Sequence, residues 1–217
     1  MFSTEWESIY QKGEQLNAFP YTEVVSFLHK YKNIKSAGNV LDVGCGSGVH
    51  SALFADFGFT VDAFDASQSA IGFAKIKYKD LSNINFVTST TDGFLPSIKY
   101  DLVLDRLCTS QTGFLSTKRF YDRLTNYINA DGTIFWQGFC DTNSGKSYAE
   151  FYDEKNGYWD NFSDGEFKDL GCTTFFSVSD VESIFEKYDL IEFRKISDKN
   201  LKSGYLRNHW YVEARLK

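Results

Sequence analysis

The stretch from Val40 to Asp65 constrains the fold of this 217-residue chain more than any other part of its sequence. It reads VLDVGCGSGVHSALFADFGFTVDAFD. An apolar run leads to an acid, three glycines follow at alternate positions, and a second apolar run ends on another acid. This order predicts a strand, a glycine loop, a helix, a turn and a second strand. Because open α/β sheets bind ligands at the carboxyl ends of their strands, we expect Asp65 to face a ligand.

The glycine loop and Asp65 together predict a nucleoside site. Glycines let the chain turn sharply and let a ligand approach the bare backbone, and the following helix points its partially positive N-terminus at the loop. The Asp65 carboxylate can accept hydrogen bonds from both hydroxyls of a ribose. A dinucleotide site prefers G-x-G-x-x-G, and Val49 stands where that pattern has its third glycine. NAD or FAD binding, and a loop that has lost its ligand, remain as alternatives.

The D-x-G-x-G-x-G form of the loop resembles motif I of the class I S-adenosylmethionine (SAM)-dependent methyltransferases. The resemblance is specific over Val40–Ser67 and extends more loosely from Trp6 to the C-terminus. It implies that SAM is the cofactor and S-adenosyl-L-homocysteine (SAH) the product. The residues that match the family's cofactor-binding motif are Asp42, Gly44, Cys45, Gly46, Gly48, Asp65 and Ala66.

The resemblance also implies an α/β fold: a Rossmann-like, doubly wound sheet of seven strands in the order 3-2-1-4-5-7-6. Strand 7 is antiparallel, and helices cover both faces. After the strand that precedes Gly44, we expect strands at Thr60–Asp65, Asn85–Thr88, Tyr100–Asp105, Thr133–Gly138, Leu190–Ile196 and His209–Leu216. We expect helices at Ser3–Lys12, Thr22–Lys32, Val49–Phe57, Ser67–Lys79 and Thr117–Ile128, and a turn at Asn129–Gly132. A capping box at Ser179 and Glu182 is expected to open a last helix, which ends at Tyr188.

The chain is long enough for one domain with an ample core, and two of its segments carry additional expectations. Residues 1–32 resemble the helical N-terminal lid of small-molecule methyltransferases, with Tyr10 as a cofactor contact; an aromatic staple on the sheet is the alternative. Residues 139–177 are irregular but too rich in aromatics for disorder. We expect them to cap the carboxyl edge of the sheet and to supply acceptor-pocket walls. The alternative is a surface insertion that packs or forms a homodimer.

The expected catalytic residues follow strand four and the glycine loop. The Asp105-Arg106 pair resembles that of thiopurine- and tellurite-type methyltransferases, at the place where the family's motif IV faces both cofactor and acceptor. Asp105 is therefore expected to contact the cofactor and to serve as a base. Arg106 can clamp a carboxylate or phosphate of the acceptor, or it can be structural and tied to a helix end. His50 is a third candidate, and the other two histidines are His209 on the last strand and His29 on an N-terminal helix, although a lone histidine is more often structural.

The loop after strand three, STTDGFLPS, is expected to contact adenine. In the family, an acid followed by a small residue meets the adenine amino group and N1 from this loop. Thr90 occupies the commonest position of that acid, but Asp92 is the carboxylate that this loop offers. We therefore expect Thr91 and Asp92 to make the adenine contacts.

Composition excludes several classes of function. A net charge of −6 with scattered lysines argues against nonspecific nucleic-acid binding. The four cysteines are far apart, which argues against a zinc knuckle or a redox pair and favours reduced thiols in a cytoplasmic protein. No His/Asp/Glu cluster has metal-ligand spacing. The N-terminus is polar, and no apolar run approaches the roughly 18 residues that span a membrane.

The sequence thus predicts a SAM-dependent methyltransferase that acts on an O or N atom of a small-molecule acceptor. The absence of an N-P-P-Y motif and of a basic face argues against a macromolecular acceptor. Two alternatives remain. An NAD(P)-dependent oxidoreductase is disfavoured by Val49 and by the lack of a Tyr-x-x-x-Lys pair after strand four. A non-catalytic SAM-binding module would act through its aromatic insert.

Overall fold

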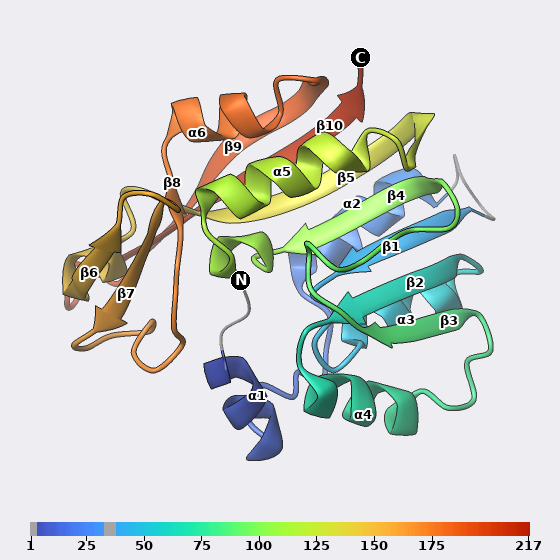
Figure 1. Ribbon diagram of the computed structural model, residues 1–217, viewed down its shortest axis with the longest axis horizontal. Coiled ribbons are helices and arrows are strands. Elements are labelled where there is room, and N and C mark those ends of the chain that lie inside the picture. The colour runs from blue at the N-terminus through green and yellow to red at the C-terminus, as the bar shows by residue number, and fades with distance from the viewer. Residues whose placement is uncertain (1–3, 33–37) are drawn as a thin grey trace.

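A mixed β-sheet forms the centre of the computed structural model, which describes residues 4–32 and 38–217 (Figure 1). The order across the sheet is β3-β2-β1-β4-β5-β10-β9, with β10 antiparallel to both of its neighbours. The strands are, in that order, β3 (Ile84–Thr88), β2 (Thr60–Asp65), β1 (Asn39–Val43), β4 (Tyr100–Arg106), β5 (Ile128–Cys140), β10 (Leu206–Leu216) and β9 (Tyr188–Lys199). The predicted fold class and strand order are confirmed.

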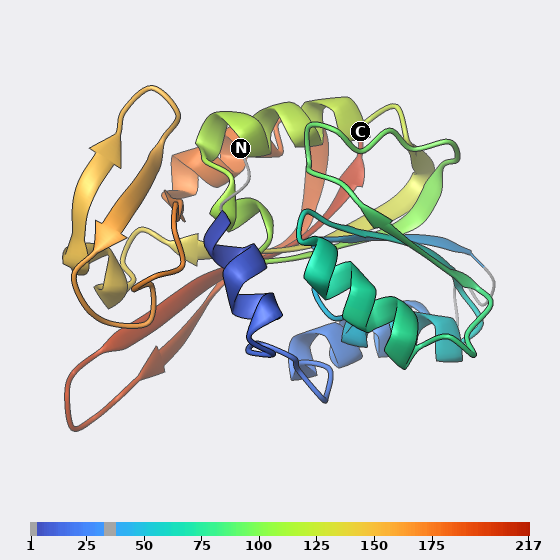
Figure 2. The same ribbon diagram turned by 60° about the horizontal axis from the view of Figure 1, so that its bottom comes forward.

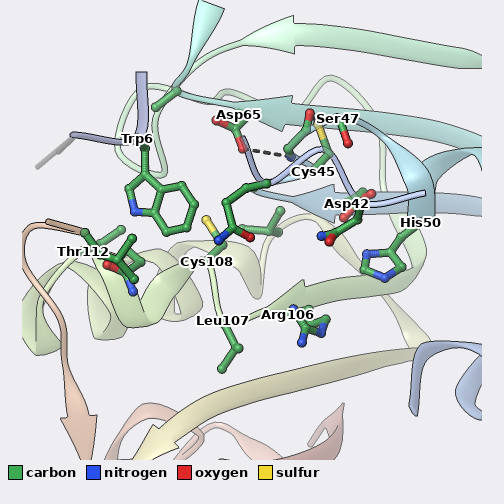
Figure 3. Close-up of a pocket in the computed structure, with 18 of the residues that line it drawn as sticks. Trp6, Asp42, Cys45, Ser47, His50, Asp65, Arg106, Leu107, Cys108 and Thr112 are labelled. Carbon is green, nitrogen blue, oxygen red and sulfur yellow. Dashed lines mark hydrogen bonds between the residues drawn. The ribbon is translucent and has the colours of Figure 1, made fainter. Parts of the chain in front are cut away.

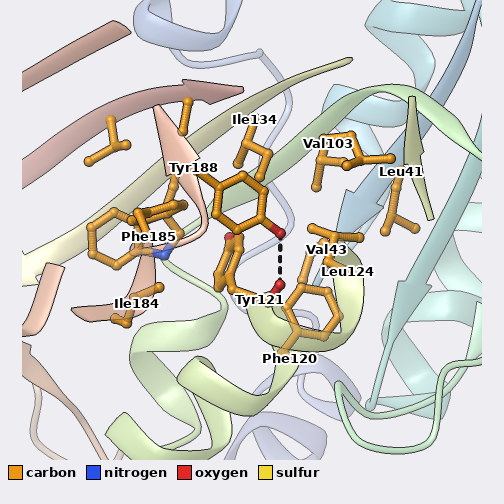
Figure 4. Close-up of a cluster of buried hydrophobic side chains, with 14 of the residues drawn as sticks. Leu41, Val43, Val103, Phe120, Tyr121, Leu124, Ile134, Ile184, Phe185 and Tyr188 are labelled. Carbon is orange, nitrogen blue, oxygen red and sulfur yellow. Dashed lines mark hydrogen bonds between the residues drawn. The ribbon is translucent and has the colours of Figure 1, made fainter. Parts of the chain in front are cut away.

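Helices cover both faces of this sheet, which explains why its central strands are apolar on both sides. On one face lie α2 (Thr22–Tyr31), α3 (Val49–Asp56) and α4 (Gln68–Lys77). On the other lie α5 (Phe114–Leu124) and α6 (Val178–Ile184), packed on a cluster in which the Tyr188 hydroxyl donates to the Tyr121 carbonyl (Figure 4). In the described part of the chain, no helix is long and apolar enough to cross a membrane.

The register of the parallel strands places their carboxyl ends in one row. Val43 of β1 lies level with Phe64 of β2 and with Asp105 of β4, and Asp105 lies level with Trp136 of β5. The residues that follow these positions therefore emerge side by side at one edge of the sheet. This edge is where the glycine loop begins.

Several predicted boundaries are wrong. The helix expected at Thr117–Ile128 begins at Phe114 and ends at Leu124, and β5 already begins at Ile128, so that the predicted turn at Asn129–Gly132 lies within a strand. The ladder between β4 and β5 has an irregularity there, which accommodates the extra residues. Ser3, the predicted start of the first helix, lies outside the described residues.

The last helix begins two residues earlier than predicted. Ser177 is its N-cap and forms a capping box with Asp180, whereas Ser179 lies within the first turn of α6. The helix also ends at Ile184 and not at Tyr188, because Tyr188 starts β9.

The aromatic segment 139–177 is more regular than predicted. It contains a hairpin of β6 (Ala149–Asp153) and β7 (Tyr158–Phe162), which stands beside the sheet at the left of Figure 2. A two-residue strand, β8 (Phe175–Phe176), pairs with the end of β5 and adds an eighth strand to the sheet. Phe162, Phe167 and Phe175 form a small core with Phe139 of β5. The segment is therefore anchored at the carboxyl edge of the sheet.

Candidate active site

A cavity of about 510 Å³ opens at the carboxyl ends of β1, β2 and β4 (Figure 3). This volume lies within the ~300–1,000 Å³ of typical small-molecule sites. Its lining comes from the loops that follow these strands, from the N-terminal segment, from the aromatic segment 139–177 and from β10. The cavity thus lies at the edge that the glycine sequence predicted.

Three glycines shape the loop on the cavity floor. Gly44, Gly46 and Gly48 have φ angles of +65°, +53° and +81°, which side-chain-bearing residues rarely adopt. A Cβ atom at Gly46 would lie 2.5 Å from the Tyr10 hydroxyl, and one at Gly44 would collide with Cys108. Backbone conformation and close packing therefore both require glycine here. The loop consequently presents bare main chain to the cavity.

Asp65 at the end of β2 is fixed by two main-chain hydrogen bonds. Gly46 N–H donates to its Oδ2 atom at 2.9 Å, and Ser67 N–H donates to its Oδ1 atom at 2.8 Å. Each oxygen keeps a further lone pair, and the half-buried side chain lines the cavity together with Ala66. Burial raises the pKa of Asp65, and the main-chain donors oppose that rise. The carboxylate is thus held in place to accept hydrogen bonds from a ligand.

Asp42 and Cys45 lie deeper in the cavity floor. Asp42 is 2% exposed and accepts a hydrogen bond from Ser51 Oγ at 2.6 Å. Burial raises the pKa of Asp42 to about 7, and the charges of Asp65 and Asp105 act in the same direction. Burial likewise raises the pKa of the Cys45 thiol. A cationic ligand group beside Asp42 would favour its ionised form.

Helix α1 (Thr4–Gln11) lies over one side of the cavity and supplies Trp6 and Tyr10 to its lining. Its Glu7 side chain attaches it to the start of α4. The carboxylate accepts hydrogen bonds from Ser67 Oγ and Ser69 Oγ, each at 2.6 Å. These bonds lower the pKa of Glu7 to about 2. They also hold α1 against the rest of the protein.

On the side of β3, the structure places only one of the two expected adenine contacts at the cavity. Thr91 is buried and lines the cavity, and its Oγ1 atom has no hydrogen-bond partner among the described residues. Asp92 is exposed and is not part of the lining, whereas Ser89 and Thr90 are. Arg123 fixes this loop by donating to main-chain carbonyls, including that of Asp92 at 3.0 Å. The geometry thus disagrees with the expected role of Asp92.

Asp105 is also not where the sequence suggested. The residue is fully buried, and it lies beneath the cavity and not in its lining. Its carboxylate accepts hydrogen bonds from Thr109 Oγ1 at 2.6 Å, from the Tyr121 hydroxyl at 2.9 Å and from Cys108 N–H at 3.1 Å. Burial raises its pKa to about 6, although these donors oppose the shift. In this structure Asp105 fixes the turn after β4 and does not face a substrate.

Arg106 and His50 both line the cavity and meet at Tyr21. The Arg106 guanidinium lies 3.2 Å from the centre of the Tyr21 ring, and the Tyr21 N–H donates to His50 Nε2 at 3.3 Å. Burial, followed by the charge of Arg106, lowers the pKa of His50 to about 3. Because its Nε2 lone pair is occupied, His50 is poorly placed to act as a base. Because Tyr21 is the N-cap of α2, Arg106 contacts a helix end through this ring, as the structural alternative supposed.

Leu107 follows Arg106 with a φ angle of +64°, which is an outlier for a bulky residue. Such strain costs on the order of 1–3 kcal/mol and concentrates at functional sites. The strained residue lines the cavity itself, between Arg106 and Cys108, which line it as well.

Sequence reasoning missed part of the acceptor side, where the lining comes from distant segments. His209 was weighed as a base from sequence, but neither its place in the cavity nor that of its neighbours was expected. The polar run after strand four and the aromatic segment were the available signals. The additional lining residues on this side include Tyr21, Gln111, Thr112, Phe139, Glu166, Phe167, Leu170, Arg207 and His209.

Comparison with known proteins identifies the family. A family profile described as a methyltransferase domain matches residues 34–187. Two malonyl-[acyl-carrier protein] O-methyltransferases of Ilyobacter polytropus are each 28% identical to the chain, over 103 and 118 residues. These matches cover 46% and 54% of the chain. The chain spans only 39% and 42% of the lengths of these two relatives.

Solved structures show the same fold at low sequence identity. A 1,6-didemethyltoxoflavin-N1-methyltransferase of Burkholderia thailandensis, crystallised with 1,6-didemethyltoxoflavin and SAH, matches with a TM-score of 0.73 at 16% identity, covering 99% of this chain and 86% of that one. A SAM-dependent methyltransferase of Methanosarcina mazei matches with a TM-score of 0.70 at 14% identity, covering 91% and 98%. Because the family profile covers more than half of the chain, the protein belongs to the methyltransferase-domain family, and it has the fold of SAM-dependent methyltransferases.

Proposed function

We propose that the protein transfers a methyl group from SAM to an O or N atom of a small-molecule acceptor. The observation that carries this proposal is the pairing of Asp65 with the bare glycine loop, through the hydrogen bond from Gly46 N–H at 2.9 Å. It fixes a carboxylate beside the main chain of the glycine loop, in the lining of a cavity large enough for a nucleoside. Family membership supports the same conclusion.

The residues present fit SAM. Asp65 has free lone pairs for the ribose hydroxyls, and the loop from Gly44 to Gly48 offers main chain for the methionine part. The unpartnered Thr91 Oγ1 and Trp6 Nε1 atoms are buried polar groups that a ligand could satisfy. When bound, SAM supplies an electrophilic methyl group on a positively charged sulfur.

The protein's own contribution is to position the acceptor and to exclude water. Helix α1 and the aromatic segment enclose the cavity from two sides, which suits a small acceptor. The complete burial of Asp105 argues against a direct role as the base. His209 lines the acceptor side, and burial together with the charge of Arg106 lowers its pKa. It is therefore neutral at pH 7 and can accept a proton from an O–H or N–H acceptor.

The charge of −6 further disfavours nucleic acid as the acceptor. A homodimer through the aromatic segment and a cytoplasmic location remain expectations from the sequence.

The test is calorimetry with SAM, SAH and NAD on native protein and on the Asp65→Asn variant. An amide at this position keeps the size of the side chain but can accept fewer hydrogen bonds. We expect SAM and SAH to bind and Asp65→Asn to weaken them by about 1–3 kcal/mol. The matched control is Asp56→Asn, which removes an exposed carboxylate of α3 outside the cavity.

Binding of NAD in preference to SAM would refute the assignment and favour the oxidoreductase alternative. Unchanged SAH affinity in Asp65→Asn would refute the role of Asp65. A screen of metabolite pools with labelled SAM then tests turnover. Tight SAM binding without transfer to any small molecule would favour a non-catalytic binding module.

A further inference from the structure

The acceptor side of the cavity carries an unpaired positive charge. Two arginines line the cavity, Arg106 and Arg207. Arg207 forms an ion pair with Glu166, with 2.8 Å between Nε and Oε2. Among residues 4–32 and 38–217, no carboxylate lies within ion-pair distance of Arg106, although Glu23 acts on its charge from further away. The buried Nε atom of Arg106 has no hydrogen-bond partner in the same residues.

Arg106 is partly buried, and a guanidinium without a counter-charge is unfavourable in such a position, so its presence requires an explanation. Tyr21 offsets part of this cost, because its ring stacks on the guanidinium. The Tyr21 side chain also contributes a hydrogen bond to Arg106, whereas the buried Nε–H donor has no partner among the described residues. Neither neighbouring histidine can offer a negative charge, and the charge of Arg106 contributes to lowering the pKa of both His50 and His209. The missing partner is an anion.

The position of Arg106 separates this anion from the adenosine. On neighbouring strands, Val43, Phe64 and Asp105 lie level with one another. The residues that directly follow them are Gly44, Asp65 and Arg106, respectively. Because adjacent strands lie about 4.8 Å apart, Arg106 is roughly 10 Å from Asp65 along the edge of the sheet, on the far side of the glycine loop. Phe139 and His209 continue the cavity beyond it, on β5 and β10.

The walls beyond Arg106 combine apolar side chains with the Glu166–Arg207 ion pair and with polar groups such as His209. Phe139 packs edge-to-face on Phe167, with 4.8 Å between the ring centroids, and Leu107 and Leu170 also line this side. The described cavity lining contains no lysine. One unpaired guanidinium without a second free cation matches a single negative charge, and its planar fork matches a carboxylate.

We propose that the methyl acceptor carries a carboxylate, which Arg106 binds, on an apolar body that packs against Phe139 and Phe167. This inference rests on the proposed function, since it names the class of acceptor for the same site. Arg106 is then the residue that determines specificity for acidic acceptors over neutral molecules of the same shape.

The experiment measures binding of matched acids and amides to SAH-saturated protein by NMR titration. The probes are benzoate against benzamide, and phenylacetate against phenylacetamide, with phenyl phosphate as a separate arm. The proteins are native, Arg106→Gln, Arg106→Lys and the control Arg119→Gln, which removes an exposed arginine of α5 that lies outside the cavity lining. Thermal unfolding shows whether each variant is folded.

We expect native protein and Arg119→Gln to bind the acid about 10-fold or more tightly than the amide in at least one pair. Arg106→Gln should lose this preference without losing SAH affinity. Arg106→Lys should keep part of it, because the charge remains but the planar fork does not. If Arg106→Gln does not fold, the acid–amide comparison on native protein and on Arg106→Lys decides the question.

Equal binding of acid and amide in both pairs would overturn the proposal. An unchanged acid preference in Arg106→Gln with weakened SAH binding would assign Arg106 to the donor's own carboxylate and would also overturn it. Tighter, Arg106-dependent binding of phenyl phosphate than of either acid would replace carboxylate by phosphate. Failure of native protein to bind SAH would refute the proposed function, whereas SAH binding without acid preference refutes this inference alone.

Discussion

Asp42 and Asp105 are two buried aspartates close to the glycine loop. Burial raises their pKa values to about 7 and about 6, well above the ordinary value of 3.8. When a folded-state pKa is raised, the folded protein holds its proton more tightly than the unfolded chain does. The stability that depends on these groups is therefore greatest below about pH 4 and falls as the pH rises toward 7.

The Asp42→Asn variant tests this sign. An amide at this position can still accept the Ser51 hydrogen bond but cannot ionise. We expect the variant to gain stability relative to native protein at pH 8, on the order of 1 kcal/mol or more, and to show little of this gain at pH 4. Thermal unfolding in the absence of ligand at both pH values is the measurement.

The control for this prediction is Asp56→Asn, which changes an exposed aspartate in the helix that follows the glycine loop. It should leave the pH dependence of unfolding unchanged. Parallel stability curves for native protein and Asp42→Asn between pH 4 and pH 8 would contradict the buried, raised-pKa state of Asp42.

Comparison of Asp65 with Asp105 shows which single residues could be placed from sequence. The partners of Asp65, Gly46 and Ser67, belong to the same strand–loop–strand unit, so the motif itself implied their proximity. Asp105 ends an equally good strand, but its hydroxyl partner Tyr121 lies on α5 and reaches it only through packing. No local pattern distinguishes a strand-end acid that faces a cavity from one that lies beneath it.

At the scale of elements, the Glu7 carboxylate attaches α1 to the body of the protein. Glu7 binds the hydroxyls of Ser67 and Ser69 at the start of α4. Since these bonds lower the pKa of Glu7 from 4.5 to about 2, their contribution is complete above pH 4.5 and is lost as the pH falls toward 2. The attachment therefore persists throughout the neutral range.

We expect the Glu7→Gln variant to loosen α1 at neutral pH, because an amide replaces charge-assisted hydrogen bonds by weaker neutral ones. Hydrogen exchange of residues 4–11 should become faster, and SAH should dissociate faster by several-fold. Glu14→Gln, at an exposed position after α1, serves as the control. Native-like exchange of α1 in Glu7→Gln would show that Trp6 and Tyr10 hold the helix without the carboxylate.

Element boundaries were predictable where one local signal acted alone. Two overlapping capping boxes compete at the start of α6, Ser177 with Asp180 and Ser179 with Glu182. In the structure, Ser177 and Asp180 form the capping box, and α6 accordingly begins at Val178. Likewise, β5 begins before its predicted turn because Tyr100 of β4 pairs with Ile128, a contact between strands that local propensity does not contain.

At the scale of the whole molecule, the clusters on the two faces share the same strands. β1 contributes Leu41 and Val43 to one cluster and Val40 to the other. The aromatic segment 139–177 is connected to the same sheet through the pairing of β8 with β5. We therefore expect one cooperative unfolding transition that near- and far-ultraviolet circular dichroism report at the same temperature.

The Phe175→Ala variant tests whether the aromatic segment belongs to that cooperative unit. Phe175 is 2% exposed and packs on Phe139, Phe162 and Phe167. We expect a loss of about 3–5 kcal/mol that moves the whole transition to lower temperature. Saturating SAH, at 100 times its dissociation constant, should restore about 2.7 kcal/mol.

Resolution of the Phe175→Ala transition into two steps would instead show that residues 139–177 unfold on their own.

The strand order was predictable because the glycine motif resembles that of a family whose strand order is known, and the alternation of strands and helices agrees with it. The hairpin of β6 and β7 was not, because apart from a bridge between Trp159 and Thr173 its strands pair with each other, and its turn at Gly157 was a weak local signal.

The walls of the cavity are drawn from Trp6 at one extreme of the chain and from His209 at the other. During synthesis on the ribosome, the first of these walls emerges long before the last. Because β10 lies between β5 and β9 in one cooperative sheet, a chain that lacks β10 should not hold the cavity in place. Nascent chains stalled before β10 should accordingly fail to retain SAH.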